Sequence, residues 1–321
     1  MKLLIHGCGY IGEVHLKSII NFHLCEVALC ETNQERLKEI ARRYDVAETY
    51  TSLDEALKHP FDGVVVCTPN FTHADDLEKC VAAGLNVMME KPMAESVASS
   101  RRMVEDCQKG KRFAFVAYCL RFAPPYQRIK SIIEAGQLGK VFSIRASVAG
   151  KKAITDAKTN YRAVKSQGGG VISDFSHEID YAMWFAGKKM KTVQCYGANA
   201  VHKAWDVLDT ADLLIGCEDE LAISIHMDFL QPYFGRSIEV YGTQGAIRYR
   251  DNECIKICTN EDGIWEDLNV HCDWDQVYHD EMAHFIHCLQ SGERPLVDEN
   301  EGLNRMELIE LCVKSAEEHH L

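Results

Sequence analysis

The chain has 321 residues, 46% of them hydrophobic and 26% charged, which is typical of a globular protein with room for two full domains. Its formal net charge of −13 argues against nucleic acid or an anionic membrane as a partner, because basic surfaces bind both. No apolar run approaches a membrane span and no cleavable signal pattern is present, so we expect a cytoplasmic protein whose 14 cysteines are buried, reduced thiols.

The first twelve residues, MKLLIHGCGYIG, predict a dinucleotide-binding turn. An apolar run, Leu3–Ile5, leads into a GxGxxG pattern, and helical spacing follows. The first glycine allows a tight turn, the second lets a pyrophosphate approach the backbone, and the third lets helix and strand pack closely. A glycine turn of another α/β fold stays open as the alternative. The predicted cofactor-binding turn comprises Gly7, Gly9, Tyr10, Ile11 and Gly12.

A second apolar strand, residues 26–30, ends in Glu31, about 20 residues after the glycines, where the dinucleotide pattern expects an acidic residue. A carboxylate there can accept hydrogen bonds from both ribose hydroxyls of NAD, and it would repel the 2′-phosphate of NADP. The sequence therefore predicts NAD as the cofactor, with NADP less suited.

Strands and helices alternate up to about residue 120, which predicts a doubly wound parallel sheet in an N-terminal domain, residues 1–121. The expected strands are 62–68, 86–89 and 112–118, and the expected helices are 33–44, 52–58, 72–83 and 96–110. Ligands bind beyond the carboxyl ends of such strands, so three segments are candidates: 68–70, 90–92 and 118–121. Lys91 can hydrogen-bond a substrate hydroxyl there and stabilise alkoxide charge. An exposed loop lysine is the alternative.

From residue 140 the pattern changes to successive strands with short links, which predicts a second domain of α+β type, residues 122–321, built on a large, open and mainly antiparallel sheet. The expected strands are 141–148, 192–198, 211–217, 221–229, 237–241, 246–250 and 254–258. Helices are expected over 171–185, 278–290 and 302–318.

The second candidate for chemistry is the segment that begins with Gly168–Gly170. Glycines before a helix let the backbone approach a ligand, and Asp174, His177 and Asp180 then recur every three residues, so we expect them on one side of that helix. An imidazole flanked by carboxylates can act as the general base for a secondary alcohol. A histidine with a purely structural role is the alternative.

Taken together, the motifs resemble the glucose-fructose oxidoreductase, inositol dehydrogenase and MocA family (Gfo/Idh/MocA) over nearly the whole chain. They are GCGYIG at 7–12, CTPN at 67–70 followed by His73, EKP at 90–92, LRFAPPY at 120–126, LGKV at 138–141, GGG at 168–170 with Asp174 and His177, and GTQGAI at 242–247. The resemblance implies a Rossmann domain, a second domain with a large open sheet, and an active site in the cleft between them. It also implies redox chemistry with NAD or NADP at a ring carbon of cyclic polyols, sugars or sugar derivatives.

The resemblance further assigns roles to residues of this chain. Lys91 would match the catalytic lysine, His177 the acid/base histidine and Asp174 its accompanying aspartate. Thr68, Pro69 and Asn70 would line the nicotinamide side, Glu31 would hold the adenosine ribose, and the motif residues His73 and Glu90 belong to the cofactor set. Many members place four steps between the aspartate and the histidine, whereas this chain has three, so Asp180 is an alternative partner for the imidazole. The SHEID form resembles a branch associated with amino sugars.

A few other residues have two interpretations each. Arg162 and Tyr118 are candidates for substrate contacts, although loop arginines usually pair on the surface. Arg121 and Tyr126 either flank the cleft or pack. His226 and Asp228 share a strand face with Ser224 and line a pocket, face solvent or lie in a subunit interface. A metal site is not expected, because His279, His284 and His287 do not converge on their helix.

The sequence thus predicts an NAD-dependent dehydrogenase for a secondary hydroxyl or ketone of a cyclic polyol, sugar or amino-sugar derivative. One rival is an enzyme that uses NAD transiently to cleave a glycosidic bond without net turnover of the cofactor. Another is a non-catalytic NAD or sugar sensor, because fold alone does not fix function. The open sheet predicts a homodimer or homotetramer.

Overall fold

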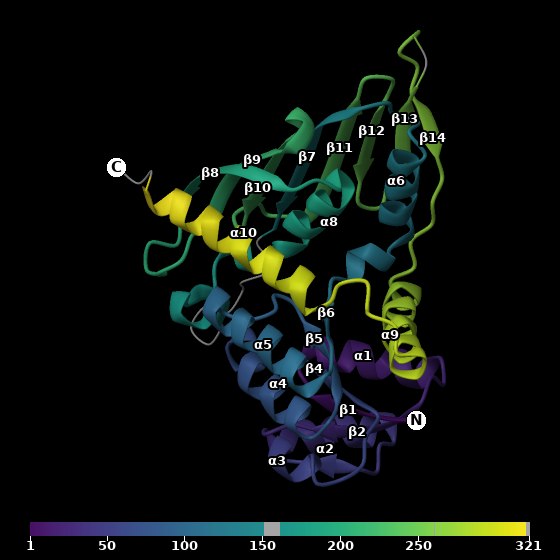
Figure 1. Ribbon diagram of the computed structural model, residues 1–321, viewed down its shortest axis with the longest axis vertical. Coiled ribbons are helices and arrows are strands. Elements are labelled where there is room, and N and C mark those ends of the chain that lie inside the picture. The colour runs from purple at the N-terminus through teal and green to yellow at the C-terminus, as the bar shows by residue number, and fades with distance from the viewer. Residues whose placement is uncertain (151–160, 260, 319–321) are drawn as a thin grey trace. The chain divides into compact units, whose positions relative to one another are not determined.

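The structure is a computed structural model that describes residues 1–150, 161–259 and 261–318. The chain forms two compact units (Figure 1). The first comprises Met1–Cys119 and Asp273–Met306, and the second comprises Leu120–Cys272 and the segment from Glu307 onward. None of the helices in the described ranges combines the length and the apolar character needed to cross a bilayer.

The first unit contains a wholly parallel sheet of six strands in the order β3-β2-β1-β4-β5-β6. The strands are β1 (Lys2–His6), β2 (Glu26–Cys30), β3 (Thr49–Tyr50), β4 (Gly63–Val66), β5 (Asn86–Glu90) and β6 (Ala114–Ala117). β4 and β6 are buried along their whole length, as expected for strands covered on both faces. The predicted doubly wound Rossmann sheet is confirmed, and its order reverses between β1 and β4, where such folds bind ligands.

Helices follow the strands as the alternation predicted. They are α1 (Tyr10–Asn21), α2 (Gln34–Tyr44), α3 (Leu53–Ala56), α4 (His73–Ala82) and α5 (Val97–Gly110). Local signals fix their ends: the Asn33 side chain accepts hydrogen bonds from the N–H groups of Glu35 and Arg36 at the start of α2, and Ser96 caps α5 in the same way. The loops at the carboxyl ends of the strands are thus held by regular, capped helices.

The segment from Asp273 to Met306 belongs to the first unit, whereas the sequence-based division at residues 121 and 122 assigned it to the second. Its helix α9 (Trp274–Ser291) packs on α1, and Phe285 stacks on Phe115 of β6. The backbone N–H of Val116 also donates to the carbonyl of Val297 at 2.9 Å. Partners so distant along the chain leave no local sequence signal, which is why the division differs.

The second unit contains an eight-stranded sheet in the order β14-β13-β12-β11-β7-β10-β9-β8. The strands are β7 (Val141–Ala149), β8 (Met190–Ala198), β9 (Thr210–Cys217), β10 (Ala222–Asp228), β11 (Gly235–Gly242), β12 (Ala246–Arg250), β13 (Ile255–Cys258) and β14 (Glu266–Leu268). β7 and β10 pair in parallel and the other neighbours pair in antiparallel fashion, so the predicted large, mainly antiparallel sheet is confirmed.

Four helices accompany this sheet: α6 (Pro124–Glu134), α7 (Val171–Asp174), α8 (Ser176–Ala186) and α10 (Glu299–Glu318), whose last twelve residues belong to the second unit. α8 contacts β7 and β10, and Figure 1 shows α8 and α10 on the same face of the sheet. The prediction of one helix over 171–185 is wrong, because the backbone of Phe175 leaves the helical region (φ −94°, ψ 32°) and separates α7 from α8.

Candidate active site

The glycine turn between β1 and α1 has the geometry of a phosphate cradle. Gly7 has φ +94°, and a Cβ on it would lie 2.8 Å from the carbonyl carbon of Cys67. A Cβ on Gly12 would lie 2.0 Å from the carbonyl oxygen of Gly7, so α1 can approach β1 only because Gly12 is glycine. A Cβ on Gly9, in contrast, meets nothing within 4 Å. Two glycines thus close the turn, and the third leaves open space in front of it.

This open space lies at the start of α1. Gly9 is the N-cap of α1 and no side chain caps the helix there, so its first N–H groups point at the space that Gly9 leaves. Tyr10 is 84% exposed beside it and Ile11 is half-buried. The turn therefore fits the pyrophosphate of a dinucleotide.

Glu31 follows β2 and is fixed next to the same turn. Its Oε2 accepts the N–H of Cys8 at 2.8 Å, and its Oε1 accepts the N–H of Asn33 at 2.9 Å. Each carboxylate oxygen can accept a further hydrogen bond, so the group can also bind two ribose hydroxyls. The binding of the adenosine ribose by Glu31 stays a prediction that this geometry permits.

Arg36 is a cation near Glu31, and a cation there could bind the 2′-phosphate of NADP and so reverse the predicted preference for NAD. Sequence reasoning did not consider Arg36. Its Nε donates to the carbonyl of Cys8 at 2.8 Å, and its two terminal nitrogens pair with Glu13 and Glu39. Burial opposes its charge, but the hydrogen bond to Glu13 raises the pKa of Arg36. Arg36 is thus engaged in bracing the turn, which favours NAD over the 2′-phosphorylated cofactor.

The segment Thr68–Asn70 follows β4 and is braced by buried polar groups. The Thr68 hydroxyl donates to Asp76 Oδ2 at 2.8 Å, and Asn70 is 2% exposed while Pro69 is exposed. Burial raises the pKa of Asp76, but hydrogen bonds from His6 and the threonine hydroxyls hold it below its usual range.

His73 is buried, with its two ring nitrogens 2.8 Å from the carbonyl of Thr68 and 3.2 Å from that of Met93. Burial lowers the pKa of His73 and so favours the neutral ring. The structure places His73 as a brace between the loop after β4 and the loop after Pro92.

Lys91 follows β5 and is half-buried, with a cis peptide bond to Pro92. Glu90 Oε2 accepts the N–H of Lys91 at 3.2 Å, and Glu90 Oε1 lies 2.7 Å from His15 Nε2. His15 is fully buried on α1, so Glu90 anchors the backbone of Lys91 to that helix. Tyr118, the predicted substrate contact after β6, is 1% exposed.

In the second unit, the glycines before α7 allow a close approach to Arg162. A Cβ on Gly169 would lie 2.5 Å from the carbonyl oxygen of Arg162, and the N–H of Gly170 donates to that oxygen at 2.8 Å. The Arg162 Nε then donates to Asp174 Oδ1 at 2.7 Å, and the charge of Asp174 raises the pKa of Arg162. Two predicted site residues, Arg162 and Asp174, therefore form an ion pair.

The expectation that Asp174, His177 and Asp180 form one stripe on one helix is wrong, because Phe175 separates α7 from α8. Asp174 ends α7, and His177 lies in the first turn of α8; both are half-buried. Asp180 is 1% exposed and accepts from Arg121 Nε at 2.8 Å and Nη2 at 2.7 Å. Asp180 thus joins α8 to the turn that precedes α6.

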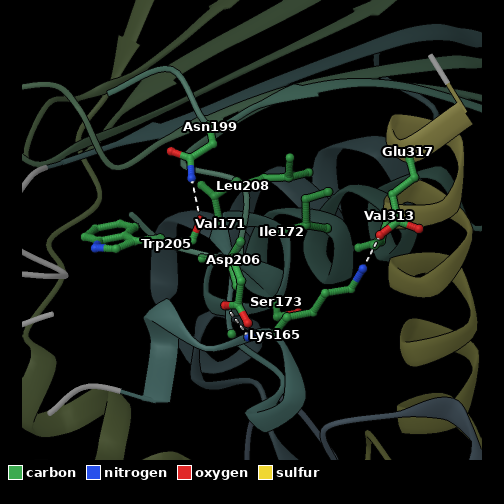
Figure 2. Close-up of a pocket in the computed structure, with 13 residues that line it drawn as sticks. Lys165, Val171, Ile172, Ser173, Asn199, Trp205, Asp206, Leu208, Val313 and Glu317 are labelled. Atoms are coloured by element: carbon green, nitrogen blue, oxygen red, sulfur yellow. Dashed lines mark hydrogen bonds and ion pairs between the residues drawn. The ribbon is translucent and has the colours of Figure 1, made fainter. Parts of the chain in front are cut away.

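A cavity of about 320 Å³ lies beside the glycine segment in the second unit (Figure 2). The backbone of Gly169 and Gly170, the loop 199–208 and the last turns of α10 form its walls. Figure 2 shows the Asn199 side chain donating to the Trp205 carbonyl, and Lys165 paired with Glu317 across the cavity. Sequence reasoning singled out the glycines of this lining but missed the loop 199–208 and α10, because these segments lie far from the glycines in the chain.

The other histidines singled out from the sequence have partners of their own. His226 on β10 lies 2.8 Å from Asp212 Oδ1 and 3.0 Å from Asp228 Oδ2; burial opposes its charge, but these hydrogen bonds raise its pKa. On α9, His284 accepts the N–H of Leu296, and His287 pairs with Glu293. Within the described ranges, no group of three or more potential metal ligands converges.

The parallel sheet with its glycine cradle and Glu31 defines a dinucleotide-binding domain suited to NAD. Residues 1–118 match the profile described as "Oxidoreductase family, NAD-binding Rossmann fold", and residues 126–248 match "GFO/IDH/MocA C-terminal domain". The chain therefore belongs to the Gfo/Idh/MocA family of NAD-dependent enzymes that act on CH–OH groups.

Similar proteins with assigned activities cover nearly the whole chain. The myo-inositol 2-dehydrogenase of Thermotoga maritima is 27% identical over 99% of this chain and 97% of its own length. The scyllo-inositol 2-dehydrogenase (NAD(+)) of Bacillus subtilis is 24% identical over 96% of this chain and 92% of its own. Among solved structures, an oxidoreductase from Agrobacterium radiobacter in complex with NAD+, L-tartaric acid and magnesium has a TM-score of 0.89 at 20% identity, covering 100% of this chain and 97% of that one.

Proposed function

We propose that this protein is an NAD-dependent dehydrogenase that interconverts a secondary hydroxyl and a ketone on the ring of a cyclic polyol, sugar or amino-sugar derivative. The observation that carries the proposal is the half-buried His177 in the first turn of α8, three residues after Asp174, in a chain that also holds Lys91 directly after β5. Two similar proteins that act on inositols match more than nine-tenths of the chain. Their substrates support a cyclic polyol and leave the particular compound open.

In this proposal His177 removes the proton of the substrate hydroxyl, as a general base must while hydride leaves the same carbon. Lys91 is assigned the second role: its ammonium group can donate a hydrogen bond to a substrate oxygen and stabilise developing negative charge. Asp174, with Oδ1 engaged by Arg162, holds the imidazole orientation through its carboxylate. Bound NAD+ supplies the hydride acceptor. Glu90 keeps Lys91 in position through its backbone N–H.

Variants of the two acting residues test this assignment. His177→Ala should lower turnover by about 10²- to 10⁴-fold, the usual contribution of a general base, and Lys91→Ala should lower it similarly, while both keep NAD+ affinity. Turnover is measured by NADH formation and affinity by titration with NAD+. His287→Ala is the matched control, because His287 is exposed on α9 and pairs with Glu293. Wild-type turnover in either active-site variant would remove that residue from the mechanism.

The substrate class is tested with NAD+ and a panel of cyclitols, free sugars, uronic acids, N-acyl amino sugars and glycosides. We expect net NADH with one of the first four classes. Glycoside cleavage without net NADH would replace the proposal with transient oxidation of the sugar. Bound NAD+ with no reaction on any member would favour a sensor.

A further inference from the structure

The first unit contains a buried acid with no role in the scheme above. Glu281 on α9 is 0% exposed, and neither of its carboxyl oxygens has a hydrogen-bond partner among the described residues. Glu299, also buried in this unit, differs: its Oε2 accepts the N–H of Ala114 at 3.2 Å, and its Oε1 pairs with Arg294. A buried carboxylate without donors is strongly disfavoured, whereas the neutral acid is tolerated. Glu281 is therefore protonated in the empty protein.

A series of side-chain contacts connects the neighbourhood of Glu281 with the backbone of Lys91. Tyr278 lies one turn before Glu281 on the same side of α9, and its ring meets that of His15 on α1 edge-on at 5.8 Å. His15 in turn lies 2.7 Å from Glu90, whose other oxygen holds the N–H of Lys91. Electrostatic interactions connect Glu281 with Glu90 from β5, Cys67 after β4 and Tyr278 on α9. His15 from α1 contacts both Tyr278 and Glu90.

Among the described residues, none of the groups shown to interact with Glu281 is a permanent cation, and both named effects on it, burial and the charge of Glu90, disfavour the carboxylate. Burial raises the pKa of Glu281 well above its usual range, and the charge of Glu90 raises it further. A positive charge that arrives with a ligand would act in the opposite direction and favour the carboxylate.

The cofactor brings such a charge to this side of the sheet. Glu31 after β2 takes the adenosine ribose, and the glycine turn after β1 takes the pyrophosphate, so the nicotinamide half belongs on the side of β4 and β5. β5 ends in Glu90. The nicotinamide ring is positively charged in NAD+ and neutral in NADH, whereas the pyrophosphate charges are the same in both.

We propose that Glu281 holds a proton that the protein releases to solvent when NAD+ binds and retains when NADH binds. Glu281 then becomes a buried counter-charge for the oxidised nicotinamide ring, and it takes a proton back from solvent once that ring is neutral, as it is in NADH. It acts as a positioning residue through electrostatics, without touching the substrate. The inference rests on NAD binding alone and is independent of the proposed substrate.

The linkage has a definite sign. Because the NAD+ complex binds fewer protons than the empty protein, NAD+ affinity rises with pH, by up to about tenfold per pH unit. The rise is confined between the pKa of Glu281 in the NAD+ complex and its higher pKa in the empty protein. NADH affinity lacks this rise. The ratio of the two affinities therefore shifts toward NAD+ as the pH increases.

Calorimetric titration of the purified protein with NAD+ and with NADH, in two buffers of different ionisation enthalpy, counts the protons exchanged. We expect NAD+ to release more protons than NADH, by up to about one per site. Glu281→Gln, which mimics the neutral acid, should abolish that difference and the pH dependence it causes. Glu299→Gln, the matched buried control, should keep both.

Equal proton exchange for NAD+ and NADH in the wild-type protein would overturn the proposal without any variant. A full difference retained in Glu281→Gln would assign the proton to another group, such as His15, and would overturn it as well. If Glu281→Gln does not fold, Glu281→Asp retains an acid at this position and should keep the difference. These titrations contain no substrate, so their outcome does not depend on whether the proposed dehydrogenase activity is correct.

Discussion

Single residues at the end of β2 are predicted to favour NAD over NADP. Glu31 is fixed by two backbone N–H groups, and the guanidinium of Arg36 is already engaged by Cys8, Glu13 and Glu39. A 2′-phosphate would therefore meet a carboxylate without an available cation to offset it. The position of Glu31 beside the glycine turn could be predicted from its spacing to the glycines, and its ribose role stays a prediction. The hydrogen bonds of Arg36 could not be predicted, because its partners lie up to 28 residues away.

Glu31→Ala should weaken NAD+ binding roughly ten- to a hundredfold, the usual effect of losing hydrogen bonds to a charged group, and should leave NADP+ binding unchanged or improved. Equilibrium titrations with both cofactors measure the ratio. Glu35→Ala, which removes an exposed carboxylate from the first turn of α2, is the control for net charge and should leave the ratio unchanged. Equal weakening of NAD+ and NADP+ by Glu31→Ala would contradict the assigned role.

At the scale of the element, the strand–turn–helix unit β1–α1 separates the requirements of folding from those of cofactor binding. Gly12→Ala places a Cβ 2.0 Å from the Gly7 carbonyl oxygen, so α1 must shift, with an expected cost of about 1–3 kcal/mol. Gly9→Ala places a Cβ in open space, and its φ of −65° suits alanine. The two variants therefore form a matched pair.

We expect Gly12→Ala to lower the melting temperature and NAD+ affinity together, and Gly9→Ala to lower NAD+ affinity at an unchanged melting temperature. Thermal unfolding of the empty protein and titration with NAD+ give the two readouts. Wild-type NAD+ affinity in Gly9→Ala would mean that the pyrophosphate does not approach this residue.

In the segment from Gly168 to Asp180, the sequence pattern did not reveal the break between α7 and α8. Apolar residues keep helical spacing across Phe175, because both short helices bury their residues in the same core, so periodicity does not reveal the break. The partners of the acidic residues are equally hidden: Arg162 pairs with Asp174, Arg121 with Asp180, and Arg236 with the fully buried Glu178. These arginines come from three separate segments, and no local pattern distinguishes a carboxylate bound to arginine from one that orients a histidine.

For the whole molecule, two sequence patterns were sufficient to predict both sheets. Strands alternate with helices in the first part of the chain, and strands follow one another in the second part. The packing of α9 and the parallel pairing of β7 with β10 were not predictable in the same way. Both join segments that are far apart in the sequence, and they depend on side chains such as Phe285 against Phe115. Local periodicity is therefore sufficient to predict which helices and strands form. It is not sufficient to predict where they pack.

The open face of the second sheet carries the prediction of a homo-oligomer. Register places Tyr196 of β8, Asp212 and Leu214 of β9, and His226 of β10 on one face, opposite the side that α8 covers. Tyr196 is 63% exposed and Leu214 50%, which a monomer rarely combines on adjacent strands. A two-fold axis across this face would bury the same patch on both subunits.

The wild-type protein should therefore sediment as a homodimer or a homotetramer, and Leu214→Glu should reduce its mass to that of a smaller species, because a buried, unpaired charge opposes association. Sedimentation equilibrium measures both masses. Leu311→Glu is the matched control: Leu311 is 41% exposed on α10, which lies on the other side of the sheet, so its substitution should leave the mass unchanged (Figure 1). A monomeric wild-type protein, or an equal effect of both substitutions, would show that the open face is not the interface.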